Sequence, residues 1–147
     1  MSKRGKIPCA APVLISPEEK YRSLFDNAGE GIYQSSVSGR ILNINPGLAR
    51  LFGYHSPEEM KRNITSAYRQ IFADGNYREK ILKEVEARGH AQFEFRFLRK
   101  DKSQGWGYTS MHAVRNALGK TVYYEGFFLD ITDRKKMEEK LREAHNL

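Results

Sequence analysis

Four histidines and one cysteine are the side chains in this sequence best suited to metal binding or nucleophilic chemistry. His55, His90, His112 and His145 show no metal-ligand spacing such as His-x-x-x-His, and Cys9 does not stand near any of them. Metal sites usually have several ligand residues at such spacings in the sequence. The sequence also lacks a glycine-rich phosphate loop and a nucleophile elbow. It therefore predicts no metal site and no catalytic residues, and this chain is not expected to be an enzyme.

The formal net charge of +7 over 147 residues is spread along the chain rather than collected in one segment. Proteins that bind nucleic acids usually gather their basic side chains on one face or helix. No apolar run approaches the length of roughly 18–20 residues that a membrane-spanning helix needs. A single cysteine cannot form an internal disulfide, which favours a reducing compartment. We therefore expect a cytoplasmic globular domain with no nucleic-acid partner and no membrane insertion within this chain.

Capping patterns locate the helices that must position any functional site. Residues 1–15 are basic and then proline-rich, which predicts a flexible leader. Helix starts are expected at Ser16-Pro17, Asn45-Pro46 and Ser56-Pro57, where a capping side chain precedes a proline. A further amphipathic helix is expected at 77–88, ending at a glycine.

Apolar residues that alternate, or run together between turns, predict five strands. The strands are expected at 32–37, 40–45, 90–98, 106–114 and 121–130. The short helices fall between the second and third strands. This order predicts an α+β fold: a five-stranded antiparallel sheet with short helices on one face, an N-terminal helix and a C-terminal exit helix.

The motif Asp130-Ile131-Thr132 stands where the last strand stops and a charged helix begins. Residues 134–147 contain no glycine or proline and many strong helix formers. Asp130 or Thr132 is expected to cap this helix through a side-chain oxygen. Because no loop separates strand from helix, a change in the strand should pass into the helix. Signal transmission is therefore predicted for Asp130, Ile131 and Thr132.

Three blocks in this order resemble the PAS domain family with its PAC segment. Gly31-Ile32-Tyr33 resembles the first strand of the family, Leu51-Phe52-Gly53-Tyr54 the end of a short helix, and Asp130-Ile131-Thr132 the strand-to-helix signature. The resemblance covers about residues 16–135, and the spacing of the blocks makes it specific. It implies a sensory domain at 16–132, followed at 133–147 by the start of a signalling helix or coiled-coil linker.

The cofactors of PAS domains can be compared with this sequence residue by residue. Members that form a flavin photoadduct use a reactive cysteine, and residues 46–90 contain none. Haem-binding members commonly use a histidine on the helix before the third strand, whereas His90 lies just past that helix. A flavin held without a covalent bond would need polar side chains such as Asn43, Asn63 or Ser110, which caps and surface positions explain equally well. No cofactor is predicted.

The resemblance also implies a cavity between the sheet and the helices, lined by apolar side chains. These side chains are either ordinary core or the wall of a pocket for a small, mostly apolar ligand. Tyr33, Tyr77 and Arg96 are candidate polar anchors for such a ligand. The candidate pocket residues are Ile32, Leu42, Leu51, Phe52, Ile71, Phe72, Tyr77, Phe95, Met111 and Phe127.

Met137, Leu141 and Ala144 step by four and then three, as in the seam of a coiled coil. A seam of fewer than two heptads is too short to be stable alone, so a longer coiled coil or a helix folded back on its own domain is expected. The helix beginning at Ser16, with Leu24 on its apolar face, is the other candidate for dimerisation.

These features together predict a sensory input and dimerisation module from a bacterial signalling protein. The resemblance implies a C-terminal output domain, most often a histidine kinase or a diguanylate cyclase. A ligand or partner would shift the population of conformations, and the Asp130-Ile131-Thr132 junction would pass the change onward. Two alternatives stay open: a homodimerisation module without a ligand, and a small-molecule-modifying enzyme, for which the sequence offers no pair of titratable residues.

Overall fold

The computed structural model describes residues 15–146, apart from the side chain of Tyr68, so the predicted leader lies outside the described residues except for Ile15. Helices and strands follow one another in the predicted order. They are α2 (Pro17–Asn27), β1 (Gly31–Ser36), β2 (Ile41–Ile44), α3 (Pro46–Leu51), α4 (Pro57–Asn63), α5 (Ala67–Gln70), α6 (Tyr77–Arg88), β3 (His90–Leu98), β4 (Gln104–Arg115), β5 (Thr121–Asp130) and α7 (Thr132–His145).

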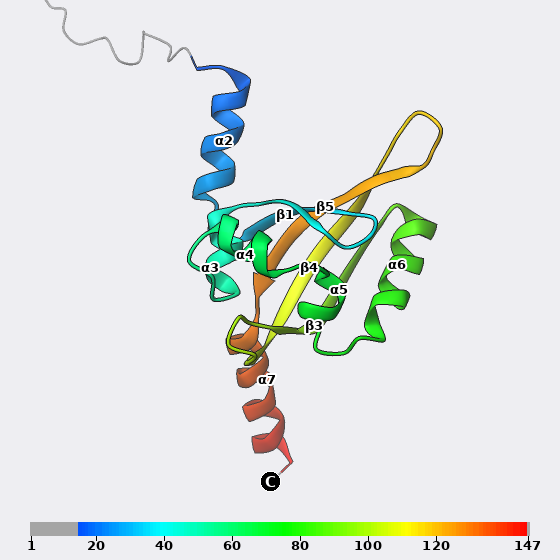
Figure 1. The fold of residues 1–147 in the computed structure, drawn as a ribbon. Coiled ribbons are helices and arrows are strands. Elements are labelled where there is room, and N and C mark those ends of the chain that lie inside the picture. Colours follow the sequence, from blue (N-terminus) through cyan, green and yellow to red (C-terminus); the bar gives the residue numbers. More distant parts are fainter. Residues whose placement is uncertain (1–14, 147) are drawn as a thin grey trace, which may run out of the picture.

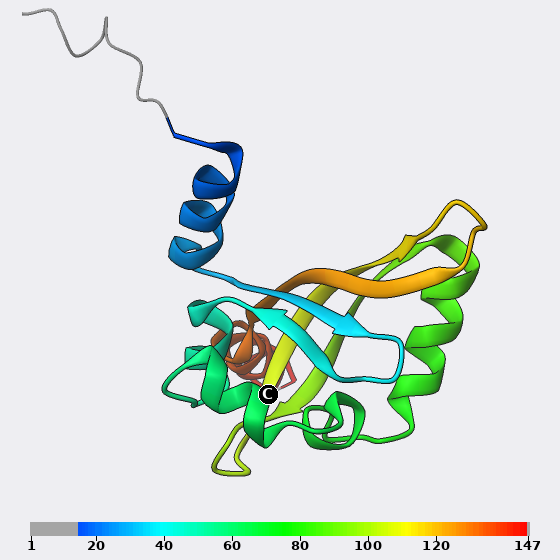
Figure 2. The same cartoon turned by 45° about the horizontal axis from the view of Figure 1, so that its top comes forward.

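The strands form one antiparallel sheet in the order β2-β1-β5-β4-β3. Helices α3 to α6 cover one face of this sheet, which we call the inner face, and the opposite side is the outer face (Figures 1 and 2). The first two strands pair with each other, and the long β5 strand joins them to β4. The predicted α+β architecture is confirmed.

Side-chain caps begin three of the helices at the predicted residues. Ser16 accepts a hydrogen bond from the Glu19 amide at 3.1 Å, and the Glu19 carboxylate accepts from the Ser16 amide at 2.9 Å. This reciprocal pair is a capping box, which satisfies two amides that the helix itself cannot bond. Asn45 caps α3 and Ser56 caps α4 by one hydrogen bond each, accepted from the amides of Leu48 and Glu59.

Asn45 also joins three elements to one another. Its fully buried side chain accepts from the amides of Ile32 (2.9 Å) and Leu48 (3.0 Å). Its amide nitrogen donates to the carbonyls of Phe25 (3.0 Å) and Glu30 (3.1 Å). The end of α2, the start of β1 and the start of α3 therefore share one buried polar centre.

Aromatic rings form the centre of the core on the inner face. Phe52 lies with its ring centroid 4.9 Å from Phe97 and 4.9 Å from Phe128, and Phe97 meets Phe128 edge-on at 5.0 Å. These edge and tilted geometries are the favourable ones for aromatic pairs. The rings come from the C-cap of α3, from β3 and from β5, so they fasten the helical layer to the sheet.

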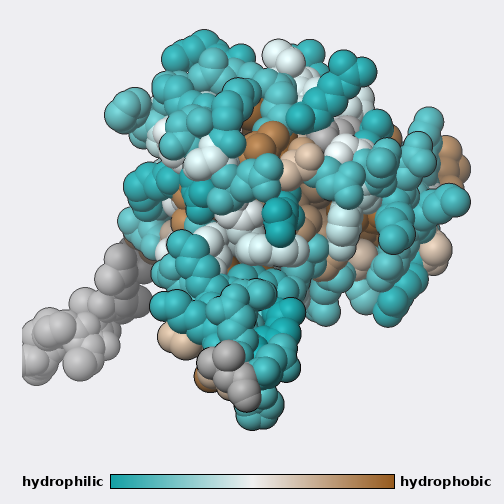
Figure 3. All heavy atoms as spheres, turned by 90° about the horizontal axis from the view of Figure 1, so that it is seen from below, coloured by the Kyte–Doolittle hydropathy of each residue, from teal (hydrophilic) through white to brown (hydrophobic). Residues whose placement is uncertain are grey.

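Helices α2 and α7 project from opposite ends of this body (Figure 1). Viewed from below, with α7 towards the viewer, most of the surface is hydrophilic and hydrophobic side chains show in small patches (Figure 3). No residue of α7 is buried, whereas α2 buries Phe25.

Candidate functional site

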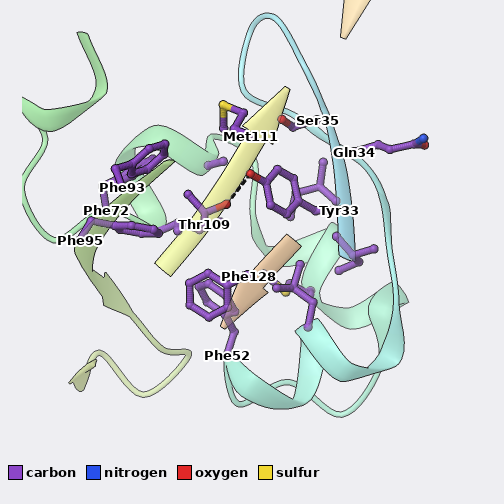
Figure 4. A pocket seen from close by; sticks show the side chains of 16 residues that line it. Tyr33, Gln34, Ser35, Phe52, Phe72, Phe93, Phe95, Thr109, Met111 and Phe128 are labelled. Atoms are coloured by element: carbon purple, nitrogen blue, oxygen red, sulfur yellow. Dashed lines mark hydrogen bonds between the residues drawn. The ribbon is translucent and has the colours of Figure 1, made fainter. Parts of the chain in front are cut away.

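A cavity of about 80 Å³ lies between the inner face of the sheet and the helices (Figure 4). Its wall is predominantly apolar, and none of the described lining residues carries a charged side chain. The lining residues are Tyr33, Gln34, Ser35, Ile41, Ile44, Leu48, Phe52, Met60, Ala67, Ile71, Phe72, Phe93, Phe95, Thr109, Met111 and Phe128.

Three side chains with hydroxyl groups lie in this wall, Tyr33, Ser35 and Thr109, and two of these hydroxyls are joined by a hydrogen bond. The Tyr33 hydroxyl lies 2.6 Å from Thr109 Oγ1, and Thr109 Oγ1 donates to the Phe127 carbonyl at 2.8 Å. Because the single proton of Thr109 goes to Phe127, Tyr33 must donate in its bond to Thr109. The hydrogen bonds thus run in one direction, from β1 through β4 to β5. Gln34 points away from the cavity, and its side-chain amide donates to Glu125 on the outer face at 3.3 Å.

Half of the predicted pocket residues line this cavity. They are Phe52, Ile71, Phe72, Phe95 and Met111. Tyr33, predicted as a polar anchor, also lies in the wall. The other predicted pocket residues, Ile32, Leu42, Leu51, Tyr77 and Phe127, lie elsewhere.

Ile32 and Phe127 lie on the outer face, opposite the predicted one. They pair across β1 and β5, as Gln34 and Glu125 do two residues away. Side chains two residues apart on a strand share a face. The charged Glu125 therefore marks the solvent face of β5, and this feature of the sequence places Phe127 outside and Phe128 inside.

Leu42, Leu51 and Tyr77 miss the cavity for other reasons. A register shift in the pairing of β1 with β2 leaves Leu42 46% exposed, while Ile41 and Ile44 face inwards. Leu51 and Tyr77 pack against the core from its margin, and the Tyr77 hydroxyl donates to the Glu94 carbonyl at 3.0 Å.

Several cavity residues were not predicted from the sequence. Leu48 and Met60 reach the cavity from α3 and α4, and Thr109 and Phe128 reach it from β4 and β5. The inward position of Thr109 follows from the alternation that was predicted for β4, because Met111 lies two residues away. Which residues of the short helices reach the cavity depends on how those helices pack against the sheet, and this cannot be predicted from the sequence pattern.

The polar side chains considered for flavin or haem lie outside the cavity wall. Asn63 donates to the Glu59 carbonyl at the end of α4, Asn43 is exposed on β2, and Ser110 is buried on the outer side of β4. His90 is exposed on the outer face, with its ring centroid 5.8 Å from that of His112. Arg96, a predicted anchor, lies over the Trp106 ring instead.

Within residues 15–146, no three side chains of histidine, cysteine, aspartate or glutamate are grouped so that they could hold a metal ion. Cys9 lies outside the described residues.

The predicted transmission motif joins β5 to α7 through a compact set of contacts. Asp130 Oδ1 accepts from the Thr132 amide at 3.0 Å, and Asp130 Oδ2 lies 3.5 Å from an Arg99 guanidinium nitrogen. Thr132 Oγ1 accepts from the Trp106 amide at 3.0 Å, and the Ile131 amide donates to the Trp106 carbonyl at 2.8 Å.

The capping prediction for this motif is confirmed for Asp130 and not for Thr132. The N-cap position is Ile131, which has no capping side chain. Asp130 satisfies the first helical amide from one position before the N-cap, and the hydroxyl of Thr132 donates to Asp130 while it accepts from Trp106 of β4. The Trp106 amide of neighbouring β4 binds the threonine hydroxyl, and the local sequence pattern alone does not predict this contact.

The first turn of α7 rests on the outer face through an ion-pair cluster. Glu94 of β3 contacts Arg134, and it lies 2.6 Å from Lys135 Nζ. Lys135 Nζ also stands 4.7 Å from the centre of the Trp106 ring. The hydrogen bond from Lys135 is the largest cause that holds the pKa of Glu94 below its usual value, while burial opposes it.

The apolar positions proposed for dimerisation are exposed. Leu24 is 70% exposed, Met137 57% and Leu141 64%, and Ala144 is exposed as well. In this single chain α7 therefore does not fold back to bury its seam.

The family model described as a PAS domain matches residues 29–133. This chain belongs to the PAS domain family. PAS domains are sensory, non-catalytic modules typical of signal-transduction proteins such as histidine kinases. No helix within the described part of this PAS domain is long and apolar enough to cross a membrane.

Similar proteins include sensory kinases. The sensor histidine kinase TmoS of Ectopseudomonas mendocina is 23% identical to this PAS domain over 148 residues, and the match spans 97% of this chain but 15% of the curated relative. A sensory box histidine kinase/response regulator from Burkholderia thailandensis E264 superposes with a TM-score of 0.68 at 22% identity, over 86% of this chain and 95% of the other. An RNA-binding light-oxygen-voltage receptor superposes with a TM-score of 0.69 at 26% identity, over 100% of this chain and 41% of the receptor chain.

Proposed function

We propose that this PAS domain is the sensory input and dimerisation module of a cytoplasmic signalling protein. A small ligand or a partner shifts the packing of the sheet, and the Asp130-Ile131-Thr132 junction passes that shift into α7. A C-terminal output domain, a histidine kinase or a diguanylate cyclase, then responds. The kinase relatives support this reading, since the matched segment is a small part of a much longer protein.

The observation that carries the proposal is that the cavity and the helix junction share two strands. Thr109 of β4 and Phe128 of β5 line the cavity. Trp106 lies three residues before Thr109 on β4 and forms hydrogen bonds with Thr132 and Ile131. Asp130 lies two residues after Phe128 on β5 and forms a hydrogen bond with Thr132. Antiparallel β4 and β5 thus run from the cavity wall to the base of α7, so a ligand that alters their spacing moves that base.

Replacing Asp130 with alanine tests the transmission role. The change removes the contacts to Thr132 and Arg99, so we expect output activity of the longer protein to lose its response to the stimulus while the domain stays folded. Asp133→Ala is the matched control, because Asp133 is an exposed carboxylate three residues away, in the first turn of α7. An Asp130→Ala protein whose output is unchanged would exclude this role.

Native mass spectrometry of the purified domain, together with an absorbance spectrum, tests the ligand. Extra mass that disappears on denaturation would support ligand sensing, and visible absorbance would indicate flavin or haem. We expect no visible absorbance, because a cavity of about 80 Å³ does not fit either ring system.

A second candidate is a homodimerisation module without a ligand. The exposed Leu24, Met137 and Leu141 on the two projecting helices favour it. Analytical ultracentrifugation separates the candidates: a dimer that forms without added ligand and loses affinity in a Met137→Ala, Leu141→Ala variant supports this one. We expect no nucleic-acid partner in either case.

A further inference from the structure

We infer that the cavity binds a small, uncharged molecule that donates a hydrogen bond to the Thr109 hydroxyl, with short-chain alcohols as the chemical class. This inference rests on the proposed sensory function and names the kind of ligand that the domain senses.

The wall of the cavity excludes charged ligands. None of its described lining residues is acidic, basic or a histidine, and Thr109 is only 3% exposed. A charge placed there without a partner would lose its hydration at a cost of several kcal/mol. A ligand that enters this cavity is therefore neutral.

The volume of the cavity limits the ligand to a few atoms. An engineered apolar cavity of about 150 Å³ holds benzene. A cavity of about 80 Å³ therefore holds about three to five non-hydrogen atoms. Aromatic rings and methionine side chains supply an apolar surface for the hydrocarbon part.

The direction of the hydrogen bonds selects a donor. Thr109 Oγ1 donates its one hydrogen to the Phe127 carbonyl and accepts a hydrogen bond from the Tyr33 hydroxyl. A hydroxyl oxygen has two acceptor positions, so any further hydrogen bond to Thr109 must be donated by the ligand. An alcohol meets this requirement, whereas a ketone cannot bond to Thr109 and would have to accept from another hydroxyl of the wall, such as that of Ser35.

The hydrogen bond between Tyr33 and Thr109 depends on a glycine in β5, Gly126. Gly126 pairs with Tyr33 across the strands, and a Cβ atom at this position would lie 2.9 Å from the Tyr33 hydroxyl and 2.0 Å from the Ser110 carbonyl. Only glycine at this position allows β5 to lie close enough to β4 and β1 for Tyr33 to reach Thr109.

Titration of the ¹⁵N-labelled chain with four probes tests the inference. The probes are 2-propanol, acetone, acetate and xenon, of which the first three have four non-hydrogen atoms each. We expect 2-propanol to shift the amide signals of Thr109 and Phe128 with a Kd of about 0.1–10 mM, the range open to so small a ligand. Acetone should bind about fivefold more weakly, the value of one net hydrogen bond, and acetate should not bind.

Three variants show whether Thr109 is responsible. Thr109→Val keeps the shape of the side chain, and we expect it to abolish the preference for 2-propanol over acetone. Thr109→Ser should restore that preference. Ser110→Ala removes the neighbouring hydroxyl on the outer face and should leave the preference unchanged.

The outcomes separate this inference from the proposed function. If xenon and acetone bind as well as 2-propanol, the donor class is wrong but a ligand-binding cavity stands. If none of the four probes binds, the inference fails, and the native mass spectrum of the purified domain then decides between sensing of another ligand and the ligand-free module. If Thr109→Val does not fold, the same loss of preference must appear in Thr109→Ala, and an unchanged preference there would overturn the inference.

Discussion

Helices α2 and α7 both project from the same body, but they are attached by opposite means. Helix α2 buries Phe25 in its last turn, and the backbone carbonyl of Phe25 accepts a hydrogen bond from the fully buried Asn45. Helix α7 has no buried residue. Apart from the bonds of Ile131 and Thr132 to Trp106 at its start, it rests on ion pairs of its basic side chains with Glu94 that remain partly in solvent.

This difference indicates which helix can move at low cost. Disrupting buried hydrogen bonds and ring packing costs several kcal/mol of folding stability, whereas exposed ion pairs contribute about 0–1 kcal/mol each. Helix α2 is therefore expected to move with the body. Helix α7 can be displaced without unfolding the domain, as an output helix requires.

Asn45→Ala should have the largest effect on α2. The change leaves two buried amides and two carbonyls without their side-chain partner, so we expect a loss of about 3 kcal/mol in the free energy of unfolding. Urea denaturation measures this loss. Asn43→Ala, two residues earlier and exposed, should change stability by about 0.5 kcal/mol or less. Equal losses in both variants would contradict the role of Asn45.

Phe25→Ala should have the next largest effect. Phe25 is 8% exposed but lies outside the main core cluster, so we expect a loss of about 2 kcal/mol, below the usual range for a central phenylalanine. The neighbouring Leu24→Ala is the control, because Leu24 is exposed. If Leu24→Ala costs as much in dilute monomer, α2 is packed differently from this structure.

Glu94→Gln should loosen α7 with little effect on global stability. We expect the free energy of unfolding to fall by about 1 kcal/mol or less, while hydrogen exchange in the first turns of α7 becomes severalfold faster. Glu138→Gln is a close control, because Glu138 pairs with the same Arg134 and Lys135 but lies within α7 itself. Equal exchange in the two variants would show that the tie to β3 does not hold the helix.

Acidification should release the same contact and give the smallest effect. The pKa of Glu94 is lower in the folded protein than in the unfolded chain, so the contact stabilises fully above the ordinary glutamate pKa of about 4.3 and is lost as the pH falls through the lower folded value. Fluorescence of Trp106, the single tryptophan, should report the departure of Lys135. A fluorescence change below about pH 4 that persists in Glu94→Gln would assign it to another group.

The sequence predicted the elements of this fold well because their signals are local. The bounds of β3, β5 and α6 agree with the periodic patterns, and Ser16, Asn45 and Ser56 cap the helices as expected. The candidate site was predicted less completely. Both faces of β1 and β5 carry apolar side chains, so alternation alone did not decide between Phe127 and Phe128, although Glu125 would have done so.

What the sequence by itself determined is the order of the elements, the caps and the PAS family motifs, since each depends on residues within a few positions of one another. Only the tertiary structure decided the rest. It brought Thr109 to Tyr33, although 76 residues separate them, and Glu94 to Lys135 across the outer face. Such contacts depend on strand order, register and helix packing, which together fix where distant side chains meet and which no local pattern contains.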